Sequence, residues 1–132
     1  MNDEDPALRV DILAAGLRGD QKESGNTVEF LAKKFELILP NHTKVVRGGW
    51  ILSSDKPVRE LTISFDDFQY QVTVEKHGSV SAREAKLVRG VVLKTREIKL
   101  DEWINLVAES LSKYAEKNAS ARQALSDFLI GR

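Results

Sequence analysis

RELTISFDDFQYQVTVEK, residues 59–76, is the stretch that decides the fold of this chain. On either side of Asp66-Asp67, apolar and polar residues alternate with the period of two that is expected of a half-buried strand. If Asp66-Asp67 forms a two-residue loop, Phe65 lies opposite Phe68 and every apolar residue falls on one face. The further pairs are Ile63 with Tyr70 and Leu61 with Val72. A slip of one residue would expose half of these side chains to water, so the sequence specifies the register of a β-hairpin.

Patterns of helical spacing flank this hairpin on both sides. The helical stretches are residues 6–18, 26–39, 101–117 and 121–130. Residues 43–46 predict a short strand, and Asp101 is expected to cap the third helix. We therefore predict an α+β fold, in which two helices precede an antiparallel β-meander sheet of three to five strands and a C-terminal helical pair closes the chain.

One segment after the hairpin does not define its own place in the sheet. Residues 87–93, LVRGVVL, are apolar on both alternating faces. Two interpretations compete. The segment is either a central strand covered on both faces, or a strand in which Gly90 forms a bulge that switches the phase. In both interpretations the strand continues to about Ile98.

Length and composition indicate one intracellular domain. The chain has 132 residues, and we expect a single domain over residues 1–132. Within it, residues 1–25 are expected to form a loosely attached first helix and a flexible connection. The absence of cysteine excludes disulfides, cysteine-ligated metals and thiol catalysis, and it fits a cytoplasmic location. The acidic N-terminus is unlike a signal peptide, and no apolar run is long enough to span a membrane.

No arrangement of residues predicts a catalytic, cofactor or metal site. His42 and His77 lie beside turns without ligand spacing, and we expect both to be surface-loop residues. Asp66-Asp67 sits at an exposed loop, whereas acid–base catalysis needs an enclosed carboxylate pair. We therefore expect a protein that is not an enzyme. The alternative is an enzyme whose site is assembled from residues that the sequence does not group.

Charge is unevenly distributed although the chain is neutral overall. Residues 1–30 contain seven acidic and three basic residues, a net charge of −4, whereas residues 81–99 contain six basic and two acidic residues, a net charge of +4. These regions either attract each other or leave a basic segment for an external anion. The candidate anion-binding residues of the basic strand region 83–99 are Arg89, Lys94, Arg96 and Lys99. Nucleic acid is the less favoured partner, because this region holds no aromatic residue to stack on bases.

Trp50, Ile51 and Leu52 follow two glycines and belong to no clear periodic element. If they are exposed, they form a protein-contact patch, and if the segment folds back, Trp50 joins the core. With the separated charge, this segment favours a protein-interaction module or adaptor that binds another protein or a second copy of itself. Polyanion binding through residues 83–99 is the alternative function.

Overall fold

The computed structural model describes residues 9–18, 24–48 and 56–129 of the chain. Within these residues the chain forms four helices and five strands. In chain order they are α1 (Val10–Arg18), α2 (Ser24–Ile38), β1 (Thr43–Arg47), β2 (Val58–Ser64), β3 (Phe68–Val74), β4 (Val80–Val88), β5 (Val91–Ile98), α3 (Leu100–Glu116) and α4 (Ala119–Leu129). The strands form one antiparallel sheet in the order β1-β2-β3-β4-β5. The predicted α+β meander between two pairs of helices is confirmed.

β2 and β3 adopt the register that the alternation predicts. Ile63 lies opposite Tyr70, and Leu61 lies opposite Val72. All four side chains are buried, whereas the two-residue loop between the strands is exposed. The local pattern of residues 59–76 therefore sets the apolar face on which the rest of the molecule packs.

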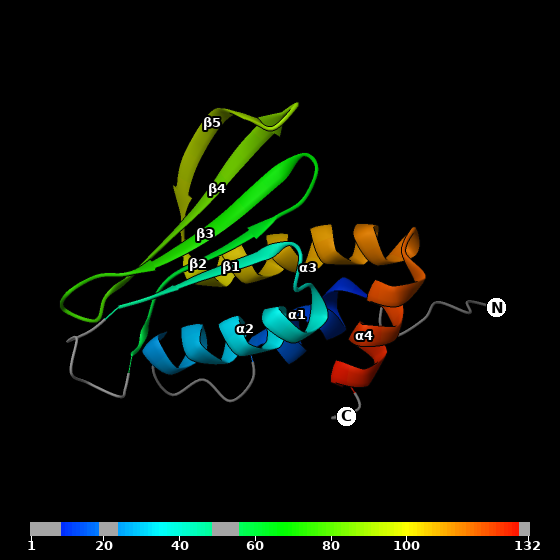
Figure 1. Ribbon diagram of the computed structural model, residues 1–132, viewed down its shortest axis with the longest axis horizontal. Coiled ribbons are helices and arrows are strands. Elements are labelled where there is room, and N and C mark those ends of the chain that lie inside the picture. The colour runs from blue at the N-terminus through cyan, green and yellow to red at the C-terminus, as the bar shows by residue number, and fades with distance from the viewer. Residues whose placement is uncertain (1–8, 19–23, 49–55, 130–132) are drawn as a thin grey trace.

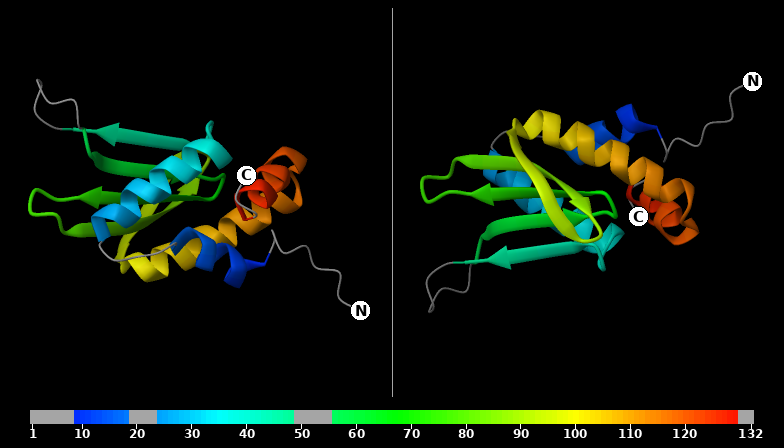
Figure 2. Two further views of the ribbon diagram at one scale, coloured as in Figure 1. Left: turned by 90° about the horizontal axis from the view of Figure 1, so that it is seen from below. Right: turned by 90° about the horizontal axis from the view of Figure 1, so that it is seen from above.

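The helices of the described chain lie on one side of the sheet (Figure 1). α2 packs on β1 and β2, and α3 packs on β3 and β4. α1 lies against α3, while α4 packs on both α2 and α3. Figure 2 shows the opposite face of the sheet without a helix over it. None of the helices in this part of the chain is both long and apolar enough to cross a membrane.

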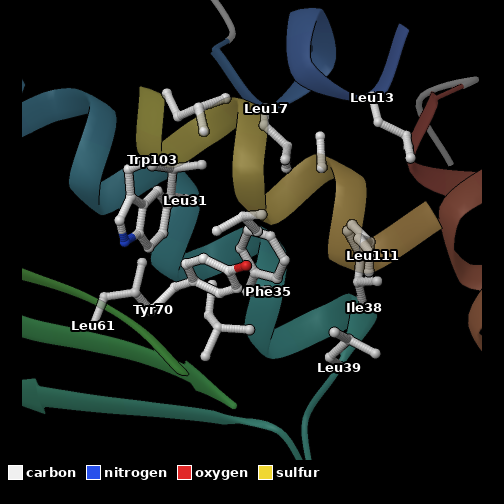
Figure 3. Close-up of a cluster of buried hydrophobic side chains, with 14 of the residues drawn as sticks. Leu13, Leu17, Leu31, Phe35, Ile38, Leu39, Leu61, Tyr70, Trp103 and Leu111 are labelled. Carbon is white, nitrogen blue, oxygen red and sulfur yellow. The ribbon is translucent and has the colours of Figure 1, made fainter. Parts of the chain in front are cut away.

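The core lies between the sheet and the helices α2 and α3. Its largest fully buried side chains are Trp103, Tyr70 and Phe35 (Figure 3). The rings of Trp103 and Tyr70 meet edge to face, with centroids 6.4 Å apart and an interplanar angle of 87°. This arrangement is favourable for aromatic pairs, and here it joins α3 to β3.

α1 is anchored on α3 by apolar and polar contacts. Leu13 and Leu17 are fully buried. At the end of α1, Arg18 Nε donates to Asp101 Oδ1 over 2.8 Å, and Arg18 Nη2 donates to Asn105 Oδ1 over 3.0 Å. The first helix is thus part of the packed core.

The predicted cap of α3 is wrong. Lys99 occupies the N-cap position, and the carboxylate of Asp101 lies in the first turn, where it accepts from Arg18 instead. Acidic side chains in the first turn still interact favourably with the helix dipole. The predicted flexible connection covers residues 19–25. Residues 19–23 lie outside the described residues, whereas Ser24 and Gly25 begin α2, so for these two residues the prediction is wrong.

Residues 87–93 do not form one strand. Arg89 and Gly90, with φ angles of +52° and +81°, are the central residues of a turn between β4 and β5. Positive φ at both positions is typical of the tight turn whose twist matches that of a hairpin. Both interpretations of this segment, as a central strand and as a bulge at Gly90, are therefore wrong. The register irregularity of this strand pair lies between Lys86 and Leu87.

Tyr70 makes the stability of the fold sensitive to alkali. Its side chain is 2% exposed, and its Oη lies 2.9 Å from Ser110 Oγ. Burial disfavours the phenolate and, together with the negative charge of Glu84, raises the pKa of Tyr70 to about 12, against the opposite effect of the Ser110 hydrogen bond. In the unfolded chain the pKa of tyrosine is about 10. Because the folded state favours the neutral phenol, Tyr70 makes its full contribution to the free energy of unfolding at pH values below the pKa of the unfolded chain. That contribution is lost as the pH rises towards the pKa of the folded state.

We therefore expect the free energy of unfolding to fall above pH 10, with Tyr70 contributing at most about 1.4 kcal/mol per pH unit. Tyr70→Phe removes this contribution, so the variant should lose stability less steeply, while the lysines affect both proteins equally. Urea unfolding followed by circular dichroism between about pH 9 and pH 12 makes the comparison. Parallel pH profiles for the two proteins would contradict the raised pKa.

Candidate functional site

The four basic residues predicted to bind an anion are spread along β5. Arg89 lies in the β4–β5 turn, Lys94 and Arg96 lie within β5, and Lys99 follows the strand. A strand rises about 3.3 Å per residue, so the two ends of β5 are roughly 25 Å apart. No single small anion can contact all four residues.

Arg96 is already paired within the protein. Its Nε donates to Glu84 Oε1 over 2.7 Å, and its Nη1 lies 3.5 Å from Glu102 Oε2. The hydrogen bond and the charge of Glu84 raise the pKa of Arg96. In the described part of the chain, Arg89 and Lys94 make no ion pair. Their charges remain open to a partner.

Opposite charges are matched at the base of the β4–β5 hairpin, and like charges meet nearer its turn. At the base, Glu84 lies opposite Arg96. Further along, Lys86 lies opposite Lys94. Directly opposed like charges destabilise an antiparallel pair by a few tenths to about 1 kcal/mol. The end of this hairpin is therefore a basic surface that an external carboxylate would stabilise.

Residues 86–94, which we call the hairpin tip, combine these charges with exposed aliphatic side chains. The exposed fractions are 43% for Val88, 62% for Val91, 49% for Val92 and 63% for Leu93. The hairpin tip extends past the end of β3, because Phe68, the first residue of β3, already lies opposite Lys86 (Figure 1). The result is a projecting surface that is both aliphatic and basic.

The turn at the apex adds a further positive charge. Arg89 occupies a backbone position with φ of +52° that usually holds asparagine, aspartate or glycine. Positive φ is unfavourable for a side chain of this kind by about 1 kcal/mol. Local backbone strain of this kind often accompanies a functional role of the side chain.

The sequence patterns do not identify the exposed aliphatic residues, although one signal was present. Residues 80–98 cover nineteen positions, whereas strands usually have three to ten residues. A run of this length therefore predicts two strands with a turn between them. Arg89-Gly90, near its middle, contains the only glycine in the run.

Trp50, Ile51 and Leu52, the predicted protein-contact patch, lie outside the described residues. The patch therefore stays a prediction.

His42 is a second feature that the sequence patterns do not identify. It lies in the turn before β1, as predicted, but it is half-buried, whereas His77 is exposed. His42 Nδ1 lies 2.8 Å from the carbonyl oxygen of Ser64, and Nε2 lies 3.1 Å from Tyr114 Oη. Since a carbonyl only accepts, Nδ1 donates, and Nε2 of a neutral ring accepts from Tyr114. Tyr114 in turn accepts from Asn118 Nδ2 over 3.0 Å.

This hydrogen-bond network adjoins an open depression of about 380 Å³ between the β2–β3 loop and α3. The depression is lined by Phe65, Asp66, Asp67, Phe68, Ser110, Lys113, Tyr114, Lys117 and Asn118. Both ring nitrogens of His42 are engaged, which favours a structural junction over acid–base catalysis. Among the described residues, no group of three or more histidine, aspartate and glutamate side chains is placed to hold a metal ion.

Asn118 should contribute the most stability within this network. Its Oδ1 accepts from the amide nitrogen of Ala121 over 2.9 Å and thereby caps α4. We expect Asn118→Ala to lower the free energy of unfolding by about 1–2 kcal/mol. Asn118→Asp keeps the capping oxygen and loses only the hydrogen bond to Tyr114, so it should lower the free energy of unfolding by less. Urea unfolding measures both, and equal losses would contradict the capping role.

Comparisons of the chain with models of protein families, with curated proteins and with solved structures find no match. The fold and the site define the class of the protein. It is an α+β domain whose five-stranded antiparallel meander is covered by helices on one face and carries an exposed hairpin tip.

Proposed function

We propose that this protein is a non-enzymatic interaction module that binds a protein partner through the hairpin tip. The observation that carries the proposal is the exposure of aliphatic side chains from Val88 to Leu93 on a hairpin that projects beyond β3. Contiguous exposed apolar surface with a charged rim marks protein-contact sites. Lys86 and Lys94 provide such a rim.

Protection of a sheet edge is the competing explanation for these lysines. Charged residues on an edge strand hinder edge-to-edge aggregation. This role accounts for Lys86 and Lys94, but it does not account for Val91 and Leu93, whose exposure would itself promote association. A binding role explains the charged and the aliphatic residues together.

The proposal includes both another protein and a second copy of this chain as partners. A cysteine-free sequence fits an adaptor of the reducing cytoplasm. The predicted patch of Trp50, Ile51 and Leu52 remains a second candidate contact surface of the same module.

The test compares two exposed leucines. Leu93 in the hairpin tip is 63% exposed, and Leu37 on α2 is 70% exposed. We expect wild type and Leu37→Gln to recover the same stoichiometric partner from a lysate of the native cells, and Leu93→Gln to lose it. With the partner identified and purified, Leu93→Gln should weaken binding at least tenfold, because a buried leucine contributes about 1.5–3 kcal/mol.

Two results would overturn the proposal. One is an equal affinity of wild type and Leu93→Gln for the recovered partner. The other is the absence of any protein whose recovery depends on the hairpin tip. Thermal unfolding of all three proteins is the control, and substitutions at such exposed positions should change stability by no more than about 0.5 kcal/mol.

Polyanion binding through the basic strand region is the second candidate function. Arg89 and Lys94, which form no ion pair among the described residues, favour it, whereas the pairing of Arg96 with Glu84 counts against it. A labelled single-stranded oligonucleotide is a suitable probe. Affinity that falls steeply with salt and is lost in Lys94→Gln would support this function, and a flat salt dependence would remove it.

A further inference from the structure

β5 leaves one backbone edge of the sheet open. Among the described residues it pairs with β4 alone, from Val91 to Ile98 except at Leu93, where the register shifts. β5 contains no proline, so every residue carries both a backbone donor and a backbone acceptor. β1, at the other edge, spans only five residues against the eight of β5. β5 is therefore the longer edge for the addition of a strand.

The charges along β5 select an acidic partner. Lys94 faces Lys86 across the strand pair, and Arg89 has no charged partner in the described chain. A carboxylate beside Lys94 would relieve the repulsion between the two lysines. Residues 81–99 together carry a net charge of +4, which would also steer an acidic segment towards this edge.

The residue pattern of β5 divides the edge into two halves. Residues 91–93 are aliphatic and exposed. Beyond them, the register places Lys94 and Arg96 on one face, opposite Lys86 and Glu84. An added strand would therefore need aliphatic residues beside 91–93 and acidic residues at alternate positions, one beside Lys94 and one beside Arg96. Lys94 is the main determinant, because Arg96 already binds Glu84 within the protein.

We infer that the partner contributes an extended segment, aliphatic in one half and alternately acidic in the other, which adds as a sixth strand to β5. This inference rests on the proposed function and names the chemistry of the partner. Main-chain hydrogen bonds to the open edge supply affinity, while Lys94 and the exposed aliphatic residues supply selectivity.

Charge argues against a second copy of the chain as the occupant. A two-fold interface brings the same surface of both copies together. Two copies of residues 81–99, each with a net charge of +4, would then meet at the junction. An acidic segment neutralises this charge, whereas a second copy doubles it.

Backbone chemistry argues against a lipid bilayer as the occupant. The open edge of β5 carries N–H and C=O groups without a partner in the sheet, and hydrocarbon cannot satisfy them. Residues 86–94 also contain no tryptophan or tyrosine, the residues that anchor proteins at a membrane interface. An extended peptide satisfies the same backbone groups directly.

The probe is a synthetic eight-residue peptide, prepared in both chain directions, with three valines in one half and glutamate at alternate positions in the other. Titration of the ¹⁵N-labelled full chain should shift amide resonances of residues 91–98 and slow hydrogen exchange at the outer edge of β5. A peptide with lysine in place of glutamate should bind at least tenfold more weakly. A peptide that is N-methylated at alternate amides along its pairing edge should also bind at least tenfold more weakly.

A charge exchange gives the sharpest control. Lys94→Glu places a carboxylate opposite Lys86, a favourable cross-strand pair, so the variant should fold. It should bind the glutamate peptide at least tenfold more weakly than wild type and bind the lysine peptide more tightly. Affinity of the two charge-matched pairs, wild type with the glutamate peptide and Lys94→Glu with the lysine peptide, should weaken as the salt concentration rises.

Several outcomes would overturn the strand addition. One is that the β5 resonances do not shift with the glutamate peptide in either chain direction, and another is that N-methylation of the peptide does not weaken binding. The others are dimerisation of the free chain through β5 in sedimentation measurements and binding of the hairpin tip to vesicles of phosphatidylcholine and phosphatidylserine. If the peptide fails but Leu93→Gln still loses a cellular protein, the proposed function stands with a partner of different chemistry. If both fail, the hairpin tip is not a binding surface.

Discussion

Replacing Trp103 by alanine should cause the largest loss of stability, about 3–5 kcal/mol. Trp103 is fully buried, and Figure 3 shows its indole ring among Leu31 of α2 and the sheet residues Leu61 and Tyr70. Alanine would leave a cavity where three parts of the core meet. Such a cavity lacks both the transfer free energy of the indole and its dispersion contacts. Because the free energy of unfolding of a domain of this size is only about 5–15 kcal/mol, the substitution would remove a large part of it.

Trp103→Phe is the matched control for this substitution. Phenylalanine keeps most of the apolar volume and the aromatic contact with Tyr70. It also removes the indole Nε1, which is buried and finds no hydrogen-bond acceptor among the described residues. We expect Trp103→Phe to lower the free energy of unfolding by less than half as much as Trp103→Ala does. Urea unfolding followed by far-ultraviolet circular dichroism measures both, and a loss below about 1 kcal/mol for Trp103→Ala would contradict its place in the core.

Replacing Leu17 by alanine should lower the free energy of unfolding by about 2–5 kcal/mol. Leu17 is fully buried where α1 packs on α3, and Arg18 beside it binds Asp101 and Asn105 on α3. A helix of nine residues is too short to be stable alone, so its structure depends on this contact. Loss of the side chain should therefore affect the whole domain.

Ala15→Ser is the control, because Ala15 is on the exposed face of α1 and its substitution should cost no more than about 0.5 kcal/mol. Native-state hydrogen exchange distinguishes a docked first helix from one that opens independently. If α1 is an integral part of the fold, its slowest amides exchange with the same free energy as those of α3, and Leu17→Ala lowers both. If α1 opens alone, Leu17→Ala lowers its own protection and leaves that of α3 unchanged.

Most of the fold could be predicted because its signals are local. The alternation within residues 59–76 determined which side chains of β2 and β3 face the core, since a strand turns each successive side chain to the opposite face. The apolar stripes likewise indicated the helices that cover this face. Asp101 marks the limit of such reasoning, because its nearness to Arg18 results from the packing of α1 on α3 and not from the helix start.

The candidate site could be predicted only in part. Arg89 and Lys94 were identified by charge alone, whereas Val91, Val92 and Leu93 were assigned to a covered or bulged strand. An apolar run has the same composition whether it is covered or projecting. Its exposure depends on where the neighbouring strand ends, and that was not visible in residues 87–93 themselves.

The sequence by itself determined the order of the helices and of the β2–β3 hairpin between them, the register of β2 with β3 and the apolar face of the sheet, because each is set by neighbours along the chain. Only the tertiary structure decided that β3 begins opposite Lys86 and leaves the hairpin tip without a third strand beside it. It also placed His42 against Tyr114, 72 positions away. The physical reason is the same in both cases: long-range packing decides what covers a side chain, and short-range patterns decide only which way it points.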